Sequence, residues 1–263
     1  GVRLDRTLTF RQHLENVKDK IKTRNNIIAK LAGSSWGCHA NVLRTSALAL
    51  VYSMADYCAP VWARSTHCKK VDVQLNNTMR IITGTVRSTQ LDWLPVLSNI
   101  APPDLRRQVQ TESMILKLSN YPDLSVQIDI ANHPPKRLSS RKPIWSMVQS
   151  NKSIEEMWAN KWTNTNVRNH FLVSVPDSRV PGFVLSRALW TALNRIRTGQ
   201  GRCNYQLHKW GMTDSPLCEC GRIQTTSHIV EEYQRTRLDG GIATLHICGQ
   251  MAIKWLEELD IRL

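Results

Sequence analysis

The chain has 263 residues, of which 41% are hydrophobic, so it can build one large core or two modest ones and is too apolar for wholesale disorder. Lysine and arginine outnumber aspartate and glutamate by 35 to 21, and the net charge of +14 favours a polyanionic partner, nucleic acid above all. The longest purely apolar run, residues 47–52, is far too short to cross a bilayer, and no lipidation motif indicates a membrane.

The first part of the sequence predicts a bundle of four helices. Residues 1–110 hold 16 basic and 7 acidic side chains, which makes this the most positive part of the chain. Apolar residues three and four apart predict helices over 10–33, 41–58, 69–83 and 102–120. Because the connections are short and β-branched alternation is scarce, the expected fold class is mainly α.

The first predicted helix carries a possible nucleic-acid-binding face. Thr9 and Gln12 have the spacing of a capping box at its start. Arg11, Lys18 and Lys22 then line one face, which is either an ordinary solvated surface or a stripe that binds phosphates.

The second helix is expected to bury an apolar face. That face would comprise Leu43, Ala47, Leu50, Met54 and Tyr57, with Pro60 ending the helix. The large aromatic residues that follow the apolar helices, Trp36 and Trp62, are interpreted as core anchors rather than template contacts.

Residues 121–180 are expected to form a connector. The segments 133–137 and 139–143 are rich in proline and basic residues. A short helix is predicted over 153–163, with a capping box at its start. Its tryptophans share a face at helical spacing, so burial is favoured over stacking on bases: Trp158 and Trp162.

A further helix is predicted over 183–198, and a closing helix over 249–259. Arg195, Arg197 and Arg202 flank a Gly-x-Gly turn that either lets the backbone approach a phosphate or merely caps the helix at Gly199.

The cysteines argue against a disulfide framework. Their number, seven, is odd and most are scattered, which favours a reducing compartment, and we expect an intracellular location in nucleus and cytoplasm. Cys218, Cys220 and His228 stand apart because thiolate and imidazole ligands suit Zn²⁺.

Two stretches together carry a family resemblance. The first comprises Gly1–Asp5, Phe10, His13, Leu31–Gly33, Trp36–Gly37, Tyr57–Trp62, Leu94–Pro95 and Pro102–Arg107. The second comprises Pro181–Gly182, Trp190–Gly201, Trp210–Gly211, Cys218–Gly221, Gln224–Thr225 and His228–Ile229. In order and spacing they resemble the C-terminal part of non-LTR (LINE-type, jockey-like) retrotransposon reverse transcriptases.

The resemblance implies a division of the chain into three parts. Residues 1–120 would be the thumb-like helical bundle, with Gly1–Asp5 the remnant of a preceding strand. Residues 121–180 would be the connector, and residues 181–263 a small helical region bearing the Cys/His loop. Because the chain begins with glycine and has no signal segment, we expect it to be a piece of a longer protein.

The sequence departs from the family at the polymerase site. The resemblance implies a palm whose paired aspartates bind two Mg²⁺ ions, but this chain has no Asp-Asp pair, and Met54–Tyr57 offers one carboxylate. No catalytic residue is therefore assigned here, and Mg²⁺ would belong to the missing palm.

The Cys/His cluster also departs from the family pattern. Relatives have Cys-x-Cys, seven residues, His, four residues and Cys, whereas Tyr233 occupies the last position here. Either Cys203, His208, His246 or water completes a Zn²⁺ site, or the cluster is vestigial.

The resulting prediction is a nucleic-acid-binding portion of an RNA-directed DNA polymerase, which holds RNA, DNA or an RNA–DNA hybrid and lacks the palm. The candidate contacts are Arg11, Lys18, Lys22, Arg195, Arg197 and Arg202. Two alternatives remain: a decayed or co-opted retroelement piece that is at most an interaction module, and an unrelated basic helical RNA-binding protein.

Overall fold

The computed structural model describes residues 1–132 and 152–261, and within these ranges the protein is mainly α-helical, as predicted, with two isolated β-bridges. The α-helices are α1 (Arg11–Ala29), α2 (Ala40–Ala47), α3 (Ser53–Asp56), α4 (Ala59–Trp62), α5 (Lys69–Thr83), α6 (Trp93–Ser98), α7 (Pro103–Ser119), α8 (Ser125–Asn132), α9 (Ile154–Thr163), α10 (Arg187–Arg197), α11 (Asn204–Lys209), α12 (Gly241–Ile247) and α13 (Gln250–Glu258). Shorter helical turns are η1 (Leu48–Tyr52), η3 (His170–Leu172) and η4 (His228–Glu232). The segments 133–137 and 139–143 of the expected connector lie outside the described residues.

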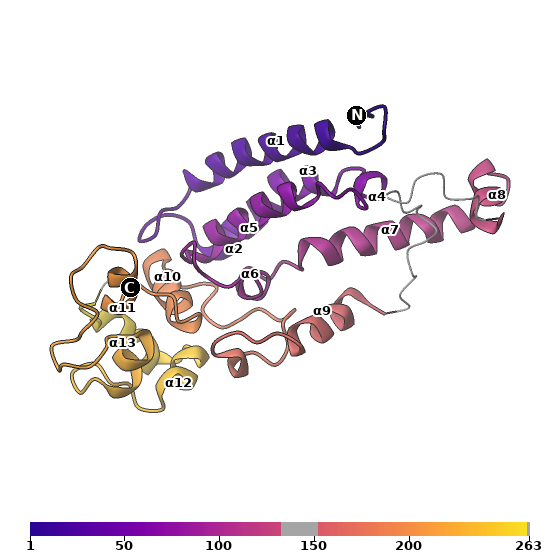
Figure 1. The fold of residues 1–263 in the computed structure, drawn as a ribbon. Helices are drawn as coiled ribbons and strands as arrows, with labels where there is room; N and C mark the ends of the chain where they lie inside the picture. Colours follow the sequence, from indigo (N-terminus) through magenta and orange to yellow (C-terminus); the bar gives the residue numbers. More distant parts are fainter. Residues whose placement is uncertain (133–151, 262–263) are drawn as a thin grey trace.

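Helices α1, α5 and α7 run along the long direction of the molecule, while α10 to α13 gather at one end (Figure 1). The α1–α5 pair makes the most extensive helix contact. Leu14, Ile21 and Ile28 of α1 follow one another at intervals of two turns, and all three are fully buried. Each large aliphatic side chain buried in this way contributes about 1.5–3 kcal/mol, so this seam holds the bundle together.

The apolar face of the second predicted helix is displaced by one residue. Between α2 and α3 the chain makes the π-helical turn η1, which holds one extra residue compared with an α-helical turn. Between Ala47 and the end of α3 the buried positions are therefore Val51, Tyr52 and Ala55, whereas Leu50 and Tyr57 are 40% and 56% exposed. The predicted face was therefore wrong at Leu50 and Tyr57, while Met54 is partly buried against the core. The helix ends at Asp56 rather than at residue 58, and Pro60 lies in the first turn of the short helix α4.

The capping box predicted at the start of α1 is also wrong. The residue that precedes α1 is Phe10, with φ of 58° and no capping side chain, and the Thr9 hydroxyl accepts only the N–H of Arg11, at 3.3 Å. The Thr9 hydroxyl instead donates to Asp5, which also accepts the backbone N–H groups of Thr7 and Thr9. These donors hold the pKa of Asp5 well below its usual range, against the smaller opposing effect of burial. The first turn is therefore organised by a polar loop before the helix.

Helix α9 packs against the bundle through its two tryptophans. The Ser153–Glu156 capping box at its start is present, as predicted. Trp158 and Trp162 are buried, as predicted, and Trp162 meets Trp93 edge-on with ring centroids 5.1 Å apart. This part of the expected connector therefore shares the core of the bundle.

The two tryptophans that were predicted to be core anchors behave differently from each other. Trp62 is a core anchor, as predicted, whereas Trp36 is 59% exposed and its predicted burial was wrong. Trp36 lies in a tight turn closed by a bridge between Ala32 and Gly37, and its indole covers Gly33. A glycine turn that folds back on itself can carry an aromatic residue outward, which periodicity does not reveal.

Helix α10 belongs to two hydrophobic cores. Trp190 is fully buried in the core of the bundle, while Leu193 and Ile196 are buried in a second core with residues of η4, α12 and α13. The two cores therefore meet along one helix.

Side chains of α10 also close the C-terminal end of α5. The last carbonyls of a helix have no partner within the helix. Here Arg187 donates to the Ile81 and Ile82 carbonyls at 2.6 and 2.7 Å, and Asn194 donates to the Thr83 carbonyl at 3.0 Å. The Arg195 side chain donates to the Gly84 carbonyl at 3.0 Å, so four consecutive carbonyls are satisfied.

Helix α10 approaches the end of α5 so closely at Gly84 that a side chain would not fit at this position. Gly84 has φ of 71° and closes α5, as predicted, and a Cβ there would lie 2.2 Å from the Thr191 hydroxyl oxygen. Arg187 also donates to the Gly33 carbonyl at 2.7 Å, and burial lowers its pKa to about 10.

Among the helices of residues 1–132 and 152–261, none has the length and apolar character that a membrane span requires.

Candidate metal centre and nucleic-acid-binding residues

The two cysteines of the candidate metal centre lie on one tight turn. Cys218 donates its backbone N–H to the Arg222 carbonyl at 2.7 Å, and Gly221 donates to the Cys218 carbonyl at 2.9 Å. A single β-bridge between Leu217 and Ile223 closes the base of the turn. This backbone geometry places Cys218 and Cys220 near each other, and the Asn204 side chain supports the turn by donating to the Leu217 carbonyl at 2.7 Å.

The third residue comes from the following helical turn. His228 begins η4, and its backbone N–H donates to the Thr225 hydroxyl at 3.1 Å. One ligand atom from each of Cys218, Cys220 and His228 lies within 4.8 Å of the others, and the distance from Cys220 Sγ to His228 Nε2 is 3.3 Å. The structure thus brings the three predicted residues together as one group that could hold a metal.

The opposite nitrogen of the histidine is held by a carboxylate. His228 Nδ1 lies 3.2 Å from Glu232 Oε2, one helical turn further along η4. Histidine ligands of metals commonly donate their other ring nitrogen to a carboxylate, because this bond fixes the tautomer that leaves the first nitrogen free to ligate. Sequence spacing gave no reason to select Glu232.

The environment of Cys218 favours a thiolate. Burial alone would raise its pKa, but hydrogen bonds from the Cys220 backbone and the His228 and Gln224 side chains outweigh burial and lower the pKa below its usual value. Since the thiolate is the form that binds metals, these contacts favour a metal over an inert pair of thiols.

Tyr233 does not take the place of the fourth ligand. Its ring stacks beside His228 with centroids 5.8 Å apart, while its hydroxyl donates to Glu219 at 3.0 Å. Of the possible substitutes, Cys203, His208 and His246 do not belong to the group of three in the described part of the chain. The donor set is therefore two sulfurs and one nitrogen, which fits Zn²⁺ with a water as the remaining ligand.

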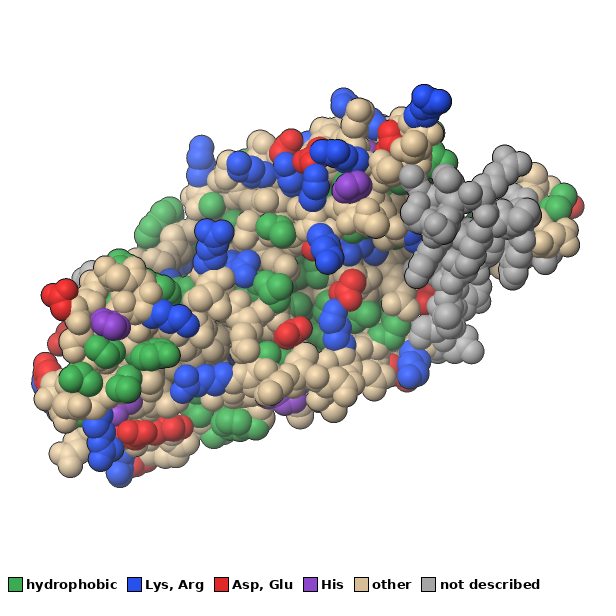
Figure 2. Space-filling model, viewed as in Figure 1, with side chains coloured by type: hydrophobic (Ala, Val, Ile, Leu, Met, Phe, Trp, Pro, Cys, Tyr) green, Lys and Arg blue, Asp and Glu red, His purple; other side chains and the backbone are tan. Residues whose placement is uncertain are grey.

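The three predicted contacts on α1 are not equivalent. Arg11 and Lys22 are exposed. Lys18 is partly buried and pairs with Glu15 at 2.8 Å and Asp19 at 3.3 Å, and these contacts raise its pKa. Figure 2 shows Lys and Arg side chains gathered along the edge of the molecule that α1 forms.

The three arginines near the Gly-x-Gly turn differ even more. Arg202 is exposed and Arg195 is partly buried. Arg197 is fully buried, where it donates to the Pro181 carbonyl at 2.8 Å and to the carbonyl and ring Nδ1 of His246 at 2.9 and 3.1 Å. In this conformation its guanidinium is held by protein acceptors and cannot reach a phosphate.

Gly199 has the role of a helix cap. It has φ of 65°, its N–H donates to the Ile196 carbonyl at 2.9 Å, and Gln200 donates to the Arg195 carbonyl at 3.0 Å, which is the Schellman arrangement. A Cβ on Gly199 would lie 2.5 Å from Cδ of Arg168, so the glycine also lets this arginine cross the turn.

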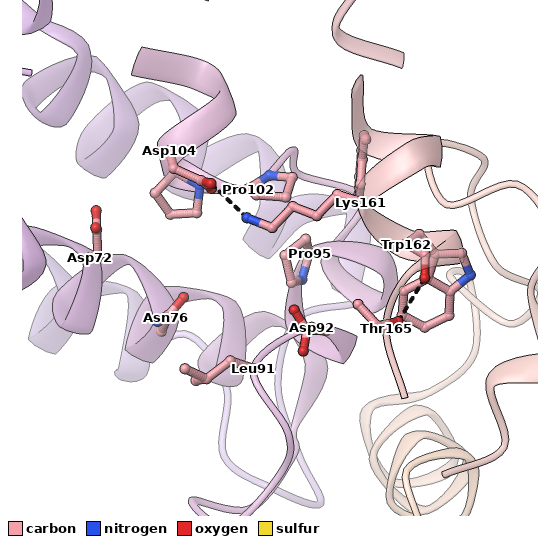
Figure 3. Close-up of a pocket in the computed structure, with 12 residues that line it drawn as sticks. Asp72, Asn76, Leu91, Asp92, Pro95, Pro102, Asp104, Lys161, Trp162 and Thr165 are labelled. Carbon is pink, nitrogen blue, oxygen red and sulfur yellow. Dashed lines mark hydrogen bonds and ion pairs between the residues drawn. The ribbon is translucent and has the colours of Figure 1, made fainter. Parts of the chain in front are cut away.

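A cavity of about 360 Å³ lies between the bundle and α9 (Figure 3). Trp158 and Trp162 form part of its wall, and its lining includes Asp72, Asp92 and Asp104. Lys161 reaches across from α9 to Asp104 at 2.6 Å, and Asp72 is held by an arginine of α7. The three aspartates do not converge on a metal-binding group in the part of the chain that the structure describes.

Comparison with known proteins gives a distant relationship to retroelement proteins. No family model matches the chain, and no solved structure matches it. The chain is related to the Pol polyproteins of retrotransposable elements, as the sequence resemblance predicted. It is 22% identical over 234 residues to the Retrovirus-related Pol polyprotein from type-1 retrotransposable element R1 of Bradysia coprophila, and 19% identical over 227 residues to that of element R1 2 of Nasonia vitripennis.

These matches span 84% and 85% of this chain, but only 22% and 54% of the two relatives. The chain therefore corresponds to about a fifth of the first relative's length and about half of the second's.

Proposed function

We propose that this chain is the nucleic-acid-binding C-terminal portion of a retroelement reverse transcriptase, an RNA-directed DNA polymerase whose palm lies outside it. The observation that carries the proposal is the similarity to two Pol polyproteins across more than four fifths of the chain. The net charge of +14 supports it, since a polyanion is the partner that such a charge attracts.

The proposed contacts to template and primer are the exposed basic residues of α1, chiefly Arg11 and Lys22. An exposed helix face can lie along a duplex and reach several phosphates at once. Lys18 would join them only by giving up its bonds to Glu15 and Asp19.

Binding of an RNA–DNA hybrid, followed by fluorescence anisotropy as salt is raised, tests this function. We expect a tight complex at low salt whose log affinity falls with log salt, with a slope of about 0.9 per phosphate contacted. The variant Arg11→Gln/Lys22→Gln should lower that slope by roughly two, while the exposed pair Lys117→Gln/Lys209→Gln should lower it less.

A flat salt dependence of the unaltered chain would contradict the proposal. It would favour the alternative of a decayed or co-opted retroelement piece, in which the positive charge is only a solvated surface.

We further propose that Cys218, Cys220 and His228 bind one Zn²⁺ with water as the fourth ligand. Bound zinc would tie the turn of residues 217–223 to η4 and so stiffen the C-terminal region.

The identity of residue 233 gives a direct test of this zinc site. Tyr233→Cys should tighten Zn²⁺ binding at least roughly tenfold, because it restores the fourth protein ligand at the family spacing. Tyr233→Phe, the matched control, should leave affinity unchanged because the hydroxyl binds Glu219. Competition with a chromophoric chelator measures the Zn²⁺ affinity of both variants, and the absorption of the Co²⁺-loaded protein reports their ligands. A Cys220→Ser variant that binds Zn²⁺ as tightly as the parent would refute the site.

A further inference from the structure

Arginines from three distant segments meet where the bundle joins the C-terminal region. We call Arg80, Arg87, Arg168, Arg195 and Arg202 the junction patch. Its centre is the loop after α5, residues 84–92. Arg80 donates from its guanidinium to the Arg87 carbonyl at 3.3 Å, and Arg195 donates to the carbonyl at the start of this loop.

Polar contacts hold the three segments together. Ser88 donates to the Gln200 side chain at 2.8 Å, and the backbone N–H of Arg168 donates to the Gln90 side chain at 3.2 Å. Gly199 allows the Arg168 side chain to lie over the turn that leads to Arg202. The arginines are therefore placed by the fold rather than scattered over a flexible surface.

Four arginines of the patch are not neutralised by a carboxylate within the described residues, although Arg80 and Arg168 also donate to the Asn77 and Ser227 side chains at 3.3 and 2.9 Å. Arg80, Arg87, Arg168 and Arg202 make no ion pair with a carboxylate in residues 1–132 and 152–261. By contrast, the arginines at the start of α7 are neutralised by Asp56 and Asp72.

Neighbouring charges add to this imbalance. Burial lowers the pKa of Arg80, and the charge of Arg87 lowers it further. Burial lowers the pKa of Arg195 in the same way, and Arg202 adds to the effect. An anion placed among these groups would relieve the mutual repulsion, and guanidinium groups bind phosphate oxygens with paired hydrogen bonds.

We propose that the junction patch binds the sugar–phosphate backbone of the nucleic acid that the protein holds, an inference that rests on the proposed function and adds a second contact region to α1. The patch includes three arginines that motif reasoning did not select, Arg80, Arg87 and Arg168. Its arginines come from the bundle and from the C-terminal region, so a single strand could engage both parts. A row of phosphates suits such a spread better than one isolated phosphate does.

The test uses the full chain with a labelled single-stranded RNA and, separately, a labelled RNA–DNA hybrid. The first variant is Arg87→Gln/Arg202→Gln, because both residues are exposed and their loss should leave the fold intact. We expect the slope of log affinity against log salt to fall by roughly two, and the affinity at about 0.1 M salt to fall roughly tenfold to a hundredfold. Adding Arg168→Gln should lower the slope again.

The matched control, Lys117→Gln/Lys209→Gln, removes the same charge from exposed positions elsewhere. If the junction variant and this control lose affinity equally, the patch is overturned while the proposed function stands. If the unaltered chain binds neither nucleic acid, the proposed function falls and the patch falls with it. Polyglutamate can be tested as a competitor of the labelled RNA, beside unlabelled RNA of equal charge. If the two compete equally well, and the junction variant loses affinity for both, the partner is an acidic protein and the inference is overturned.

Discussion

Replacement of Trp190 by alanine is expected to lower the free energy of unfolding by about 3–5 kcal/mol, the range for a large aromatic residue removed from a core. Trp190 is fully buried, its ring lies 4.9 Å from that of Phe183, and its indole N–H donates to the Ile82 carbonyl at 3.0 Å. Because α10 belongs to both cores, the variant should also separate the unfolding of the bundle from that of the C-terminal region.

Urea and thermal unfolding followed by circular dichroism measure both effects. Trp36→Ala is the control, because Trp36 is 59% exposed and its loss should cost within about 0.5 kcal/mol. Trp190→Phe should fall between the two, since the Ile82 carbonyl keeps its bond from Arg187. A Trp190→Ala variant as stable as Trp36→Ala would mean that α10 does not join the two cores.

The second large effect is a loss of stability on acidification that depends on His246. Burial, and then the charge of Arg197, lower the pKa of His246 from 6.5 to about 4. In the unfolded chain the ring would take up a proton near pH 6.5, so the native state is disfavoured as the pH falls below that value. The contribution of His246 is complete above about pH 6.5 and is lost between there and about pH 4. Because the ring is only partly buried, solvent screening reduces the loss to about 1–2 kcal/mol.

Besides burial and the charge of Arg197, a hydrogen bond to the neutral ring would be lost on protonation. Arg197 donates to His246 Nδ1 at 3.1 Å, and the guanidinium has no carboxylate partner among the contacts described for it. His246→Gln should retain an acceptor without titrating, so its stability should change less over the same pH range. Denaturant unfolding at a series of pH values compares the two proteins, and the difference between them removes the contribution of His13, whose pKa is lowered as well. If the stabilities of the two proteins change in parallel with pH, His246 does not contribute to the loss of stability and the prediction is contradicted.

Local sequence signals succeeded where the deciding interaction was itself local. The Ser153–Glu156 box depends on residues within one turn and was identified from spacing alone, and the Gly199 cap, also local, was one of the two readings that the sequence left open. The metal group was found for the same reason, because its turn and its helix lie within eleven residues.

The errors arose where a signal depended on something outside the local pattern. The extra residue of η1 shifts a face without changing composition, so a regular 3.6-residue period misplaced Leu50. The chain turns through the left-handed region at Phe10, so Thr9 lies one residue too early to be the N-cap, and spacing does not reveal such a turn.

Long-range polar contacts left no trace in the sequence. Arg197 was predicted to contact nucleic acid and Arg187 was not singled out, yet both are buried and hydrogen-bonded to backbone carbonyls of other segments. Only the fold shows that part of the positive charge is internal and that Arg80 and Arg87 lie beside Arg195 instead.

The closure of α5 by side chains of α10 also limits how this protein can be recombined. A C-terminal region exchanged for that of a relative would have to bring its own donors for four carbonyls of another part of the chain, and a small side chain opposite Gly84. Changes on either side of the joint would then have to arise in matched pairs, so the two parts are expected to be inherited together rather than shuffled as independent modules.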